Sequence, residues 1–293
     1  MICLQVGELK QFLLLAMTVN SYAKINIGLH ILNKREDNFH NIITVFQEID
    51  FCDQISIEKS DNFLFESNVS WLDDKNNTCV KAFEIIKEKF PHISNVKVFL
   101  KKNVPTNAGL GGGSSNGTAV LKTLNKLFSL DIPKEKLIEL SNKISADSPF
   151  FIDGGMQIGE GTGGRLIPID SPLKEPYILL VLPDIKINTK DAYKKCLLKG
   201  KTNIKFAKML DELKNNNLSS ELFYNDFEGY VFKTHPEIGK IKLKILDLGA
   251  KYASLSGSGS TVFGMFSKKE DMLKAYQSFS PHFSTIITSP KIS

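Results

Sequence analysis

Polar and hydrophobic residues alternate in a stretch near the start of the chain. Every second residue from Ala23 to Ile31 is apolar. A period of two is typical of a β-strand with one buried face, so we predict a strand over 21–32. The same kind of signal predicts strands over 42–49, 54–58 and 96–100. Apolar residues three and four positions apart predict helices over 77–90, 114–128 and 134–144.

The second half of the chain begins with a continuous apolar run over 177–182, which predicts a buried strand. Helical spacing follows over 189–198, 204–215, 237–248 and 268–279, and strand signals lie at 252–256, 261–266 and 285–288. Strands and helices mix without a regular βαβ repeat, which favours the α+β class. A loop with three prolines over 168–176 predicts a domain boundary. We therefore expect an N-terminal extension over 1–18 and domains over 19–167 and 168–293.

Composition narrows the class of protein. The 293 residues are 42% hydrophobic and 24% charged, as in soluble globular proteins, and no apolar run is long enough to span a membrane. The four cysteines lie far apart, which argues against a disulfide framework or a zinc site and suits a reducing cytoplasm. The net charge of +5 comes from scattered lysines, with arginine only at Arg35 and Arg165. We therefore expect neither nucleic acid nor a membrane as a partner.

The polar face of the first strand carries the first candidate residues. Lys24 and Asn26 are one pleat repeat apart and therefore point the same way. They belong either to an ordinary solvated strand face or to a polar cleft lined by a cation and an amide.

A second candidate is Asp147, which lies between a predicted helix and the apolar run 149–152. A carboxylate beside Pro149, Phe150 and Phe151 is expected to be partly desolvated, and such a group is a candidate general base. The alternative is an aspartate that caps a turn.

The densest run of glycine, GLGGGSSNG at 109–117, joins a predicted strand to a predicted helix. Unpaired N–H groups and partial positive charge at a helix N-terminus suit a phosphate group, whereas the alternative is a mobile loop with a Ser or Asn cap. The run lacks the lysine of a P-loop, and Ser114 stands where a dinucleotide fingerprint has its third glycine. A second stretch, SLSGSGS at 254–260, is either a glycine hairpin or a second set of amides for the same phosphate site.

Together these segments resemble the GHMP kinase superfamily, the galactose, homoserine, mevalonate and phosphomevalonate kinases. The run 105–115 is similar to the phosphate loop of that family, and 255–259 is similar to its C-terminal glycine motif. Three further segments are similar to one branch, whose substrate is a cytidine diphosphate sugar alcohol. They are 23–29, 34–40 with Thr44, Phe46 and Gln47 after it, and 146–151. The resemblance covers about 22–266.

The resemblance implies a two-domain α+β fold, with a nucleotide-binding N-terminal domain of the ribosomal-S5-like kind and a ferredoxin-like C-terminal domain. It implies transfer of the γ-phosphoryl group of ATP, with Mg²⁺, to a tertiary 2-hydroxyl, a step of the non-mevalonate isoprenoid pathway. By the match, Asp147 takes the hydroxyl proton, and Lys24 steadies Asp147 and the transferring charge. These roles suit the chemistry, because a crowded alcohol needs an aligned base and a loose transition state gains from positive potential.

The match also implies roles for the remaining candidates. The ATP phosphates are expected on Pro105, Thr106, Asn107, Ala108, Gly109, Leu110, Gly111, Gly112, Gly113, Ser114 and Ser115, supported by Gly257, Ser258 and Gly259. Asn77 and Lys102 match adenine-pocket positions, Phe39 and His40 match the positions that hold cytosine, and Asn26 and Thr189 match substrate contacts. No metal ligands are assigned to the protein.

Five positions depart from the family pattern: Asn38, Phe39, Asn107, Gly117 and Gly164. Asparagine tolerates positive φ, so the turns at Asn38 and Asn107 are expected to survive. Two rival functions stay open. One is a homoserine- or mevalonate-type kinase, but the substrate of such a kinase has no base to stack on Phe39 and His40. The other is an RNA-binding module, which would be expected to carry more arginine.

Overall fold

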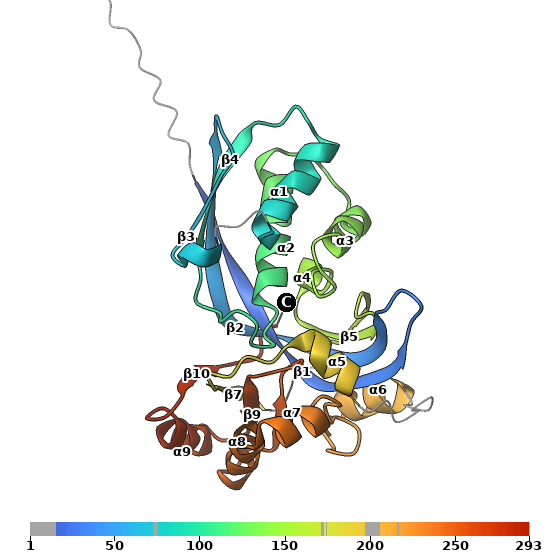
Figure 1. The fold of residues 1–293 in the computed structure, drawn as a ribbon, viewed down its shortest axis with the longest axis vertical. Coiled ribbons are helices and arrows are strands. Elements are labelled where there is room, and N and C mark those ends of the chain that lie inside the picture. The colour runs from blue at the N-terminus through green and yellow to red at the C-terminus, as the bar shows by residue number, and fades with distance from the viewer. Residues whose placement is uncertain are drawn as a thin grey trace, which may run out of the picture.

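The structure, a computed structural model, describes residues 16–72, 76–170, 173, 175–196, 206–215 and 217–292. Within these residues the chain forms two sheets, each covered by helices (Figure 1). This mixed arrangement confirms the predicted α+β class. Of the predicted extension 1–18, residues 1–15 lie outside the described residues, as do residues 197–198 and 204–205 of the helices predicted over 189–198 and 204–215.

The first sheet is built around two long antiparallel strands, β1 (Met17–Lys34) and β2 (His40–Ser60). The other edge of β2 pairs with β4 (Asn95–Lys101) through 54–60 and with β5 (Met156–Gly161) through 42–47. The edges are β3 (Leu64–Ser67), beside β4, and β6 (Arg165–Pro168), beside β5. The two strands predicted over 42–49 and 54–58 are therefore one, because β1 pairs with it on both sides of an irregularity in the register.

Four helices and a short 3₁₀ turn, η1 (Ser70–Leu72), belong to the first sheet. The helices are α1 (Thr78–Lys89), α2 (Gly112–Leu127), α3 (Lys134–Asn142) and α4 (Phe150–Asp153). They lie on one side of the sheet (Figure 1). The apolar faces of α1 and α2 meet β2 and β4 in a buried cluster that includes Phe83, Leu121, Ile55 and Val98. This packing fixes the direction in which the N-terminus of α2 points.

The second sheet is antiparallel, with the order β10-β7-β9-β8. Its strands are β7 (Tyr177–Leu182), β8 (Tyr252–Leu255), β9 (Val262–Phe266) and β10 (Ser284–Thr288). The helices of this half are α5 (Thr189–Lys195), α6 (Phe206–Lys214), α7 (Glu228–Thr234), α8 (Pro236–Asp247) and α9 (Lys269–Phe279). Of these, α8 and α9 pack on the sheet.

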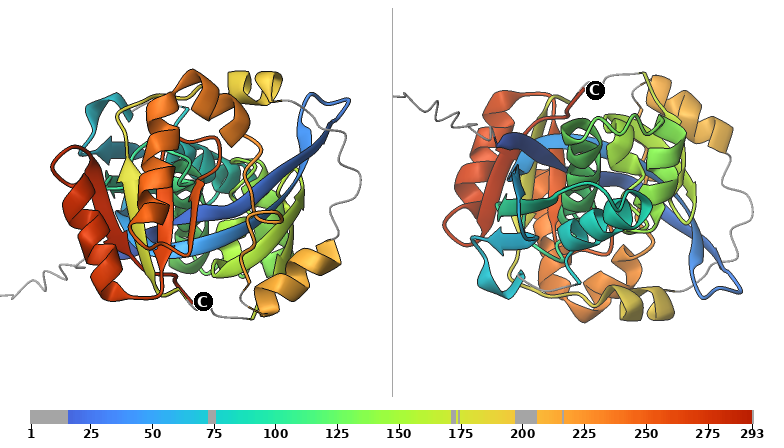
Figure 2. Two further views of the ribbon diagram at one scale, coloured as in Figure 1. Left: turned by 90° about the horizontal axis from the view of Figure 1, so that it is seen from below. Right: turned by 90° about the horizontal axis from the view of Figure 1, so that it is seen from above.

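The two sheets share one hydrophobic core. Ile25 and Ile27 of β1 lie in the same buried cluster as Ile178 of β7 and Phe263 of β9. In Figure 2 the second sheet and its helices face the viewer in one view and α1–α4 do so in the other, with β1 and β2 between them. The strand that carries Lys24 and Asn26 is therefore held from both sides.

Several elements differ from the prediction. Met17 and Thr18, assigned to the extension, pair with Ile57 and Ser56 as part of β1. Four short or glycine-containing elements, β3, β5, β6 and α4, and helix α7 were not predicted, because so few residues carry little periodic signal. No helix in the described part of the chain is long and apolar enough to cross a membrane.

Candidate active site

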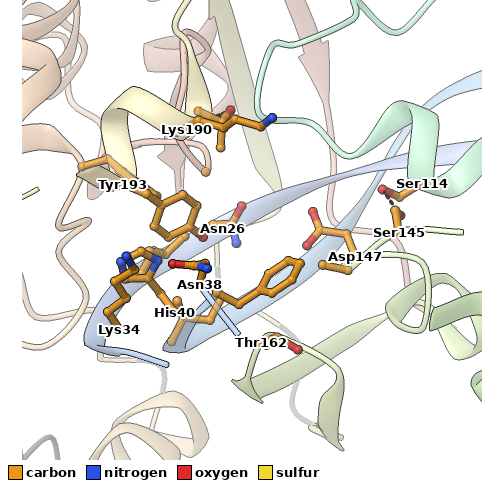
Figure 3. Close-up of a pocket in the computed structure, with 18 of the residues that line it drawn as sticks. Asn26, Lys34, Asn38, His40, Ser114, Ser145, Asp147, Thr162, Lys190 and Tyr193 are labelled. Atoms are coloured by element: carbon orange, nitrogen blue, oxygen red, sulfur yellow. Dashed lines mark hydrogen bonds between the residues drawn. The ribbon is translucent and has the colours of Figure 1, made fainter. Parts of the chain in front are cut away.

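A cavity of about 720 Å³ lies where β1, β2, α2, α5 and the loop after β8 meet (Figure 3). Its wall includes Lys24, Asn26 and Asp147, and also Phe39, His40 and Tyr193. In Figure 3, Asp147 lies at one end of the cavity, and His40 and Tyr193 lie at the other. Ser114, Thr189, Gly257 and Ser258 also line it. The structure thus brings together candidates from six separate sequence segments.

Lys24 and Asp147 form an ion pair in this cavity. Lys24 Nζ lies 3.4 Å from Asp147 Oδ2, 2.6 Å from Asn26 Oδ1 and 3.1 Å from the Gly109 carbonyl oxygen. Lys24 and Asn26 are 3% and 1% exposed, so the polar face of β1 lines a cleft and is not a solvated strand face. Asn26 Nδ2 in turn donates to Thr44 Oγ1 on β2, at 2.9 Å. The lysine is therefore held in one position by three acceptors.

The segment that carries Asp147 is hydrogen-bonded to the first turns of α2. Ser145 donates to Ser114 Oγ at 2.7 Å, and Thr118 Oγ1 donates to the Ser148 carbonyl at 3.0 Å. Phe150 and Phe151, which follow Asp147 closely in the chain, pack in a buried cluster with Phe46. The Asp147 side chain is 32% exposed, so it is partly desolvated and still faces the cavity. This is the setting that its apolar neighbours in the sequence predicted.

The glycines before α2 allow close packing around Lys24. Gly111, at φ +68°, is the N-cap, and a Cβ atom there would lie 2.9 Å from Lys24 Cε. A Cβ atom at Gly109 would lie 1.9 Å from the Ser256 carbonyl oxygen. Asn38 and Asn107, which replace family glycine or small residues, both adopt positive φ, of 67° and 55°. The predicted turns therefore survive these departures.

Gly117 is a further departure that the packing explains. A Cβ atom there would lie 2.6 Å from Ile144 Cγ2 and 2.9 Å from the Thr78 carbonyl oxygen. This chain brings α2 closer to α1 than an alanine would allow. Gly164 lies in the turn between β5 and β6, outside the cavity.

The second glycine stretch contacts the first. Ser256 Oγ donates to the Gly109 carbonyl at 2.9 Å, and the Thr261 N–H donates to the Ala108 carbonyl at 3.3 Å. Ser258 Oγ lies 2.8 Å from Thr189 Oγ1 at the start of α5. The stretch is thus a loop that closes one side of the cavity between α5 and the glycine run before α2.

Aromatic side chains form the other end of the cavity. The His40 ring stacks on Tyr193 (Figure 3), with a centroid distance of 4.8 Å and an interplanar angle of 18°. Tyr193 in turn packs edge-on against Phe227. Phe39 is 59% exposed. Burial, and then the charge of Lys34, lower the pKa of His40, and burial raises that of Tyr193. The sequence analysis missed Tyr193, although it is four residues after Thr189 and so lies on the same helix face.

Two residues matched to the adenine pocket do not line this cavity. Asn77 caps α1, because its Oδ1 accepts the Cys79 N–H at 2.9 Å, and its Nδ2 donates to the Leu72 carbonyl. Lys102 Nζ is buried against Asp53 Oδ2, at 2.5 Å. Burial lowers the pKa of Lys102, and the charge of Asp53 opposes that shift.

Comparisons with known proteins show similarity over both halves of the chain. The family model described as GHMP kinases N terminal domain matches residues 77–155, and the model described as GHMP kinases C terminal matches residues 201–284. Among solved structures, the chain is similar to a 4-(cytidine 5'-diphospho)-2C-methyl-D-erythritol kinase, with a TM-score of 0.80 and 25% identity, covering 94% of this chain and 100% of that one. It also shares its fold with a homoserine kinase from Cytophaga hutchinsonii, with a TM-score of 0.73 and 17% identity, covering 94% and 95% of the two chains.

Curated relatives are more similar in sequence. A 4-diphosphocytidyl-2-C-methyl-D-erythritol kinase from Thermodesulfovibrio yellowstonii is 36% identical, over 92% of this chain and 97% of the relative. One from Parabacteroides distasonis is 38% identical, over 84% and 90%. With these matches spanning nearly the whole chain, it belongs to the 4-diphosphocytidyl-2-C-methyl-D-erythritol kinase family of the GHMP kinases.

Proposed function

We propose that this chain transfers the γ-phosphoryl group of ATP to the 2-hydroxyl of 4-diphosphocytidyl-2-C-methyl-D-erythritol, in the non-mevalonate route to isoprenoid precursors. The observation that supports this most strongly is that one cavity is lined both by the Lys24–Asp147 pair and by Phe39, His40 and Tyr193. Homoserine and mevalonate have no base that could stack on the aromatic side chains. RNA binding does not require a half-buried ion pair in a cleft.

In this proposal Asp147 is the general base. Its carboxylate takes the proton of the substrate hydroxyl as the hydroxyl oxygen attacks the γ-phosphorus. Lys24 holds the carboxylate in place and provides positive potential where negative charge moves. Lys24 is itself fixed by Asn26 and the Gly109 carbonyl, so little reorganisation is needed during the reaction.

The first turn of α2 suits the phosphates of ATP. Gly111 starts the helix with no side-chain cap, so the first N–H groups have no side-chain partner from the cap. These N–H groups and the helix dipole favour an anion, and the backbone at Gly113, where a Cβ atom would have no neighbour nearer than Thr78 Oγ1 at 3.9 Å, is open to a phosphate. Residues 105–115 and the loop at 257–259 would hold the phosphates from two sides.

Mg²⁺ fits this cavity as a partner of the nucleotide. The described residues contain no group of three or more acidic, histidine or cysteine side chains that could hold a metal alone. Mg²⁺ commonly uses one or two protein oxygens and substrate phosphates, and the hydroxyl oxygen of Ser114, which lines the cavity, would be one such protein ligand. The ion would neutralise charge on the β- and γ-phosphates.

The aromatic end would bind the cytosine ring. Phe39 offers an exposed ring face, and His40 and Tyr193 are already stacked on each other. Binding of the nucleotide half there would orient the alcohol at the distant Asp147, because remote binding energy can position a reacting group. Cys52 and Cys79 are well-separated free thiols, which agrees with a cytoplasmic enzyme.

The test is ATP consumption with three alcohols: 4-diphosphocytidyl-2-C-methyl-D-erythritol, homoserine and mevalonate. The proposal predicts Mg²⁺-dependent turnover of the first alone, with ³¹P NMR showing a new phosphate monoester. Turnover of homoserine or mevalonate at comparable kcat/KM would contradict it.

A further inference from the structure

Three polar residues at the start of α7, Asn225, Asp226 and Glu228, form hydrogen bonds to elements that build the cavity. Asp226 Oδ2 accepts the N–H of Ile31 on β1, at 2.8 Å. Glu228 Oε1 accepts the N–H of Leu255 at the end of β8 and the hydroxyl of Ser254, both at 3.0 Å. The segment therefore joins the strand of Lys24 to the start of the second glycine stretch.

Asn225 makes the most direct contact with that stretch. It is 2% exposed, and its Nδ2 donates to the carbonyl oxygens of Leu255 and Gly257, both at 2.8 Å. Its Oδ1 accepts the Phe227 N–H at 3.0 Å. The amide nitrogen of Asn225 thus binds the carbonyl groups of the residues before and after Ser256, and both polar atoms of the Asn225 side chain have partners.

Ser256, the residue between those two carbonyl groups, contacts a residue that also binds Lys24. Ser256 Oγ donates to the Gly109 carbonyl, and the same carbonyl accepts a hydrogen bond from Lys24 Nζ. A continuous set of contacts therefore runs from Asn225 through the loop and Gly109 to Lys24 and Asp147. Asn225 itself does not line the cavity.

We infer that Asn225 is a positioning residue, which holds the loop 255–259 against the phosphate loop and thereby sets the place of Lys24. This inference rests on the proposed function. Loss of the two donor hydrogen bonds would leave two buried carbonyls without their partner and free the loop to move. A displacement of about 1 Å at a reacting centre lowers turnover by up to about 100-fold.

The test is Asn225→Asp, which keeps the shape and the Oδ1 acceptor but removes both donors. The matched control is Asn215→Asp, the same change at an exposed residue outside the cavity. We expect kcat to fall at least about tenfold in Asn225→Asp and less than twofold in the control. Binding of cytidine 5'-diphosphate, measured by calorimetry, should keep its Kd and its full stoichiometry, because the aromatic end is untouched.

Two results would overturn the inference. One is an unchanged kcat in folded Asn225→Asp, and the other is a loss of kcat matched by an equal loss of binding stoichiometry, which would mean partial unfolding only. Should this variant fail to fold, Ser256→Ala tests the next contact, with the same expected fall in kcat and the same retained Kd. An unchanged kcat there would also overturn it, whereas a wild-type protein with no turnover would contradict the proposed function instead.

Discussion

The two ends of the cavity are built differently. Lys24 and Asn26, which lie near Asp147, are almost fully buried and are fixed by hydrogen bonds within the protein. At the other end Phe39 is mostly exposed and has no partner for its ring face among the described contacts. A site for chemistry needs its geometry before the substrate arrives, whereas a site for recognition gains its contacts on binding. Damage to the first end should therefore lower kcat, and damage to the second should raise KM.

Asp147→Asn should have the largest effect. The amide keeps the shape but cannot accept the proton, and loss of a general base lowers the rate by about 10² to 10⁴. Lys24 keeps Asn26 and the Gly109 carbonyl as partners, so the fold and ATP binding should hold. Steady-state kinetics and calorimetry with an ATP analogue check this. Near-normal turnover would remove Asp147 from the mechanism.

Phe39→Ala should come next, through substrate use and not ATP binding. A base gains about 1–3 kcal/mol by stacking on an aromatic ring, so kcat/KM for the cytidine substrate should fall about ten- to hundredfold. The Kd of an ATP analogue should stay the same. Equal losses for both ligands would mean that Phe39 supports the fold, and an unchanged kcat/KM would place the base elsewhere.

Tyr193→Leu should have a smaller effect at the same end. Leucine keeps bulk against Phe227 but removes the ring under His40. An aromatic pair is worth about 0.5–1.5 kcal/mol, so KM should rise about two- to tenfold with little change in kcat. Initial-rate measurements separate the two constants. A fall in kcat alone would contradict the division between the ends.

The smallest expected effect is the pH dependence of stability that comes from His40. Burial and the charge of Lys34 lower the pKa of His40, so the folded protein binds this proton more weakly than the unfolded chain. The contribution of His40 to stability is therefore complete above the ordinary value of 6.5 and falls as the pH drops from there through the lowered value. NMR titration should find a midpoint below 6.5 that rises in Lys34→Gln. A midpoint at or above 6.5 would contradict this assignment.

The part of the cavity formed by β1 and the start of α2 was predictable from the sequence because its signals are local. Alternation along β1 put Lys24 and Asn26 on one face, and the glycine run marked the start of α2. The pairing of β2 with two partners was not predictable, since sheet neighbours lie far away in the sequence. Tyr193 was missed because a tyrosine in a helix is usually read as core. Lys102 shows the opposite case, where a matched position is buried against Asp53 by the fold.

The division between the two ends is tested most directly by titrating cytidine 5'-diphosphate into the wild type, Asp147→Asn and Phe39→Ala. The Kd should be the same in the wild type and Asp147→Asn, and about tenfold or more weaker in Phe39→Ala. Unchanged affinity in Phe39→Ala, or a comparable loss in Asp147→Asn, would contradict a cavity with separate ends for cytidine and for phosphoryl transfer.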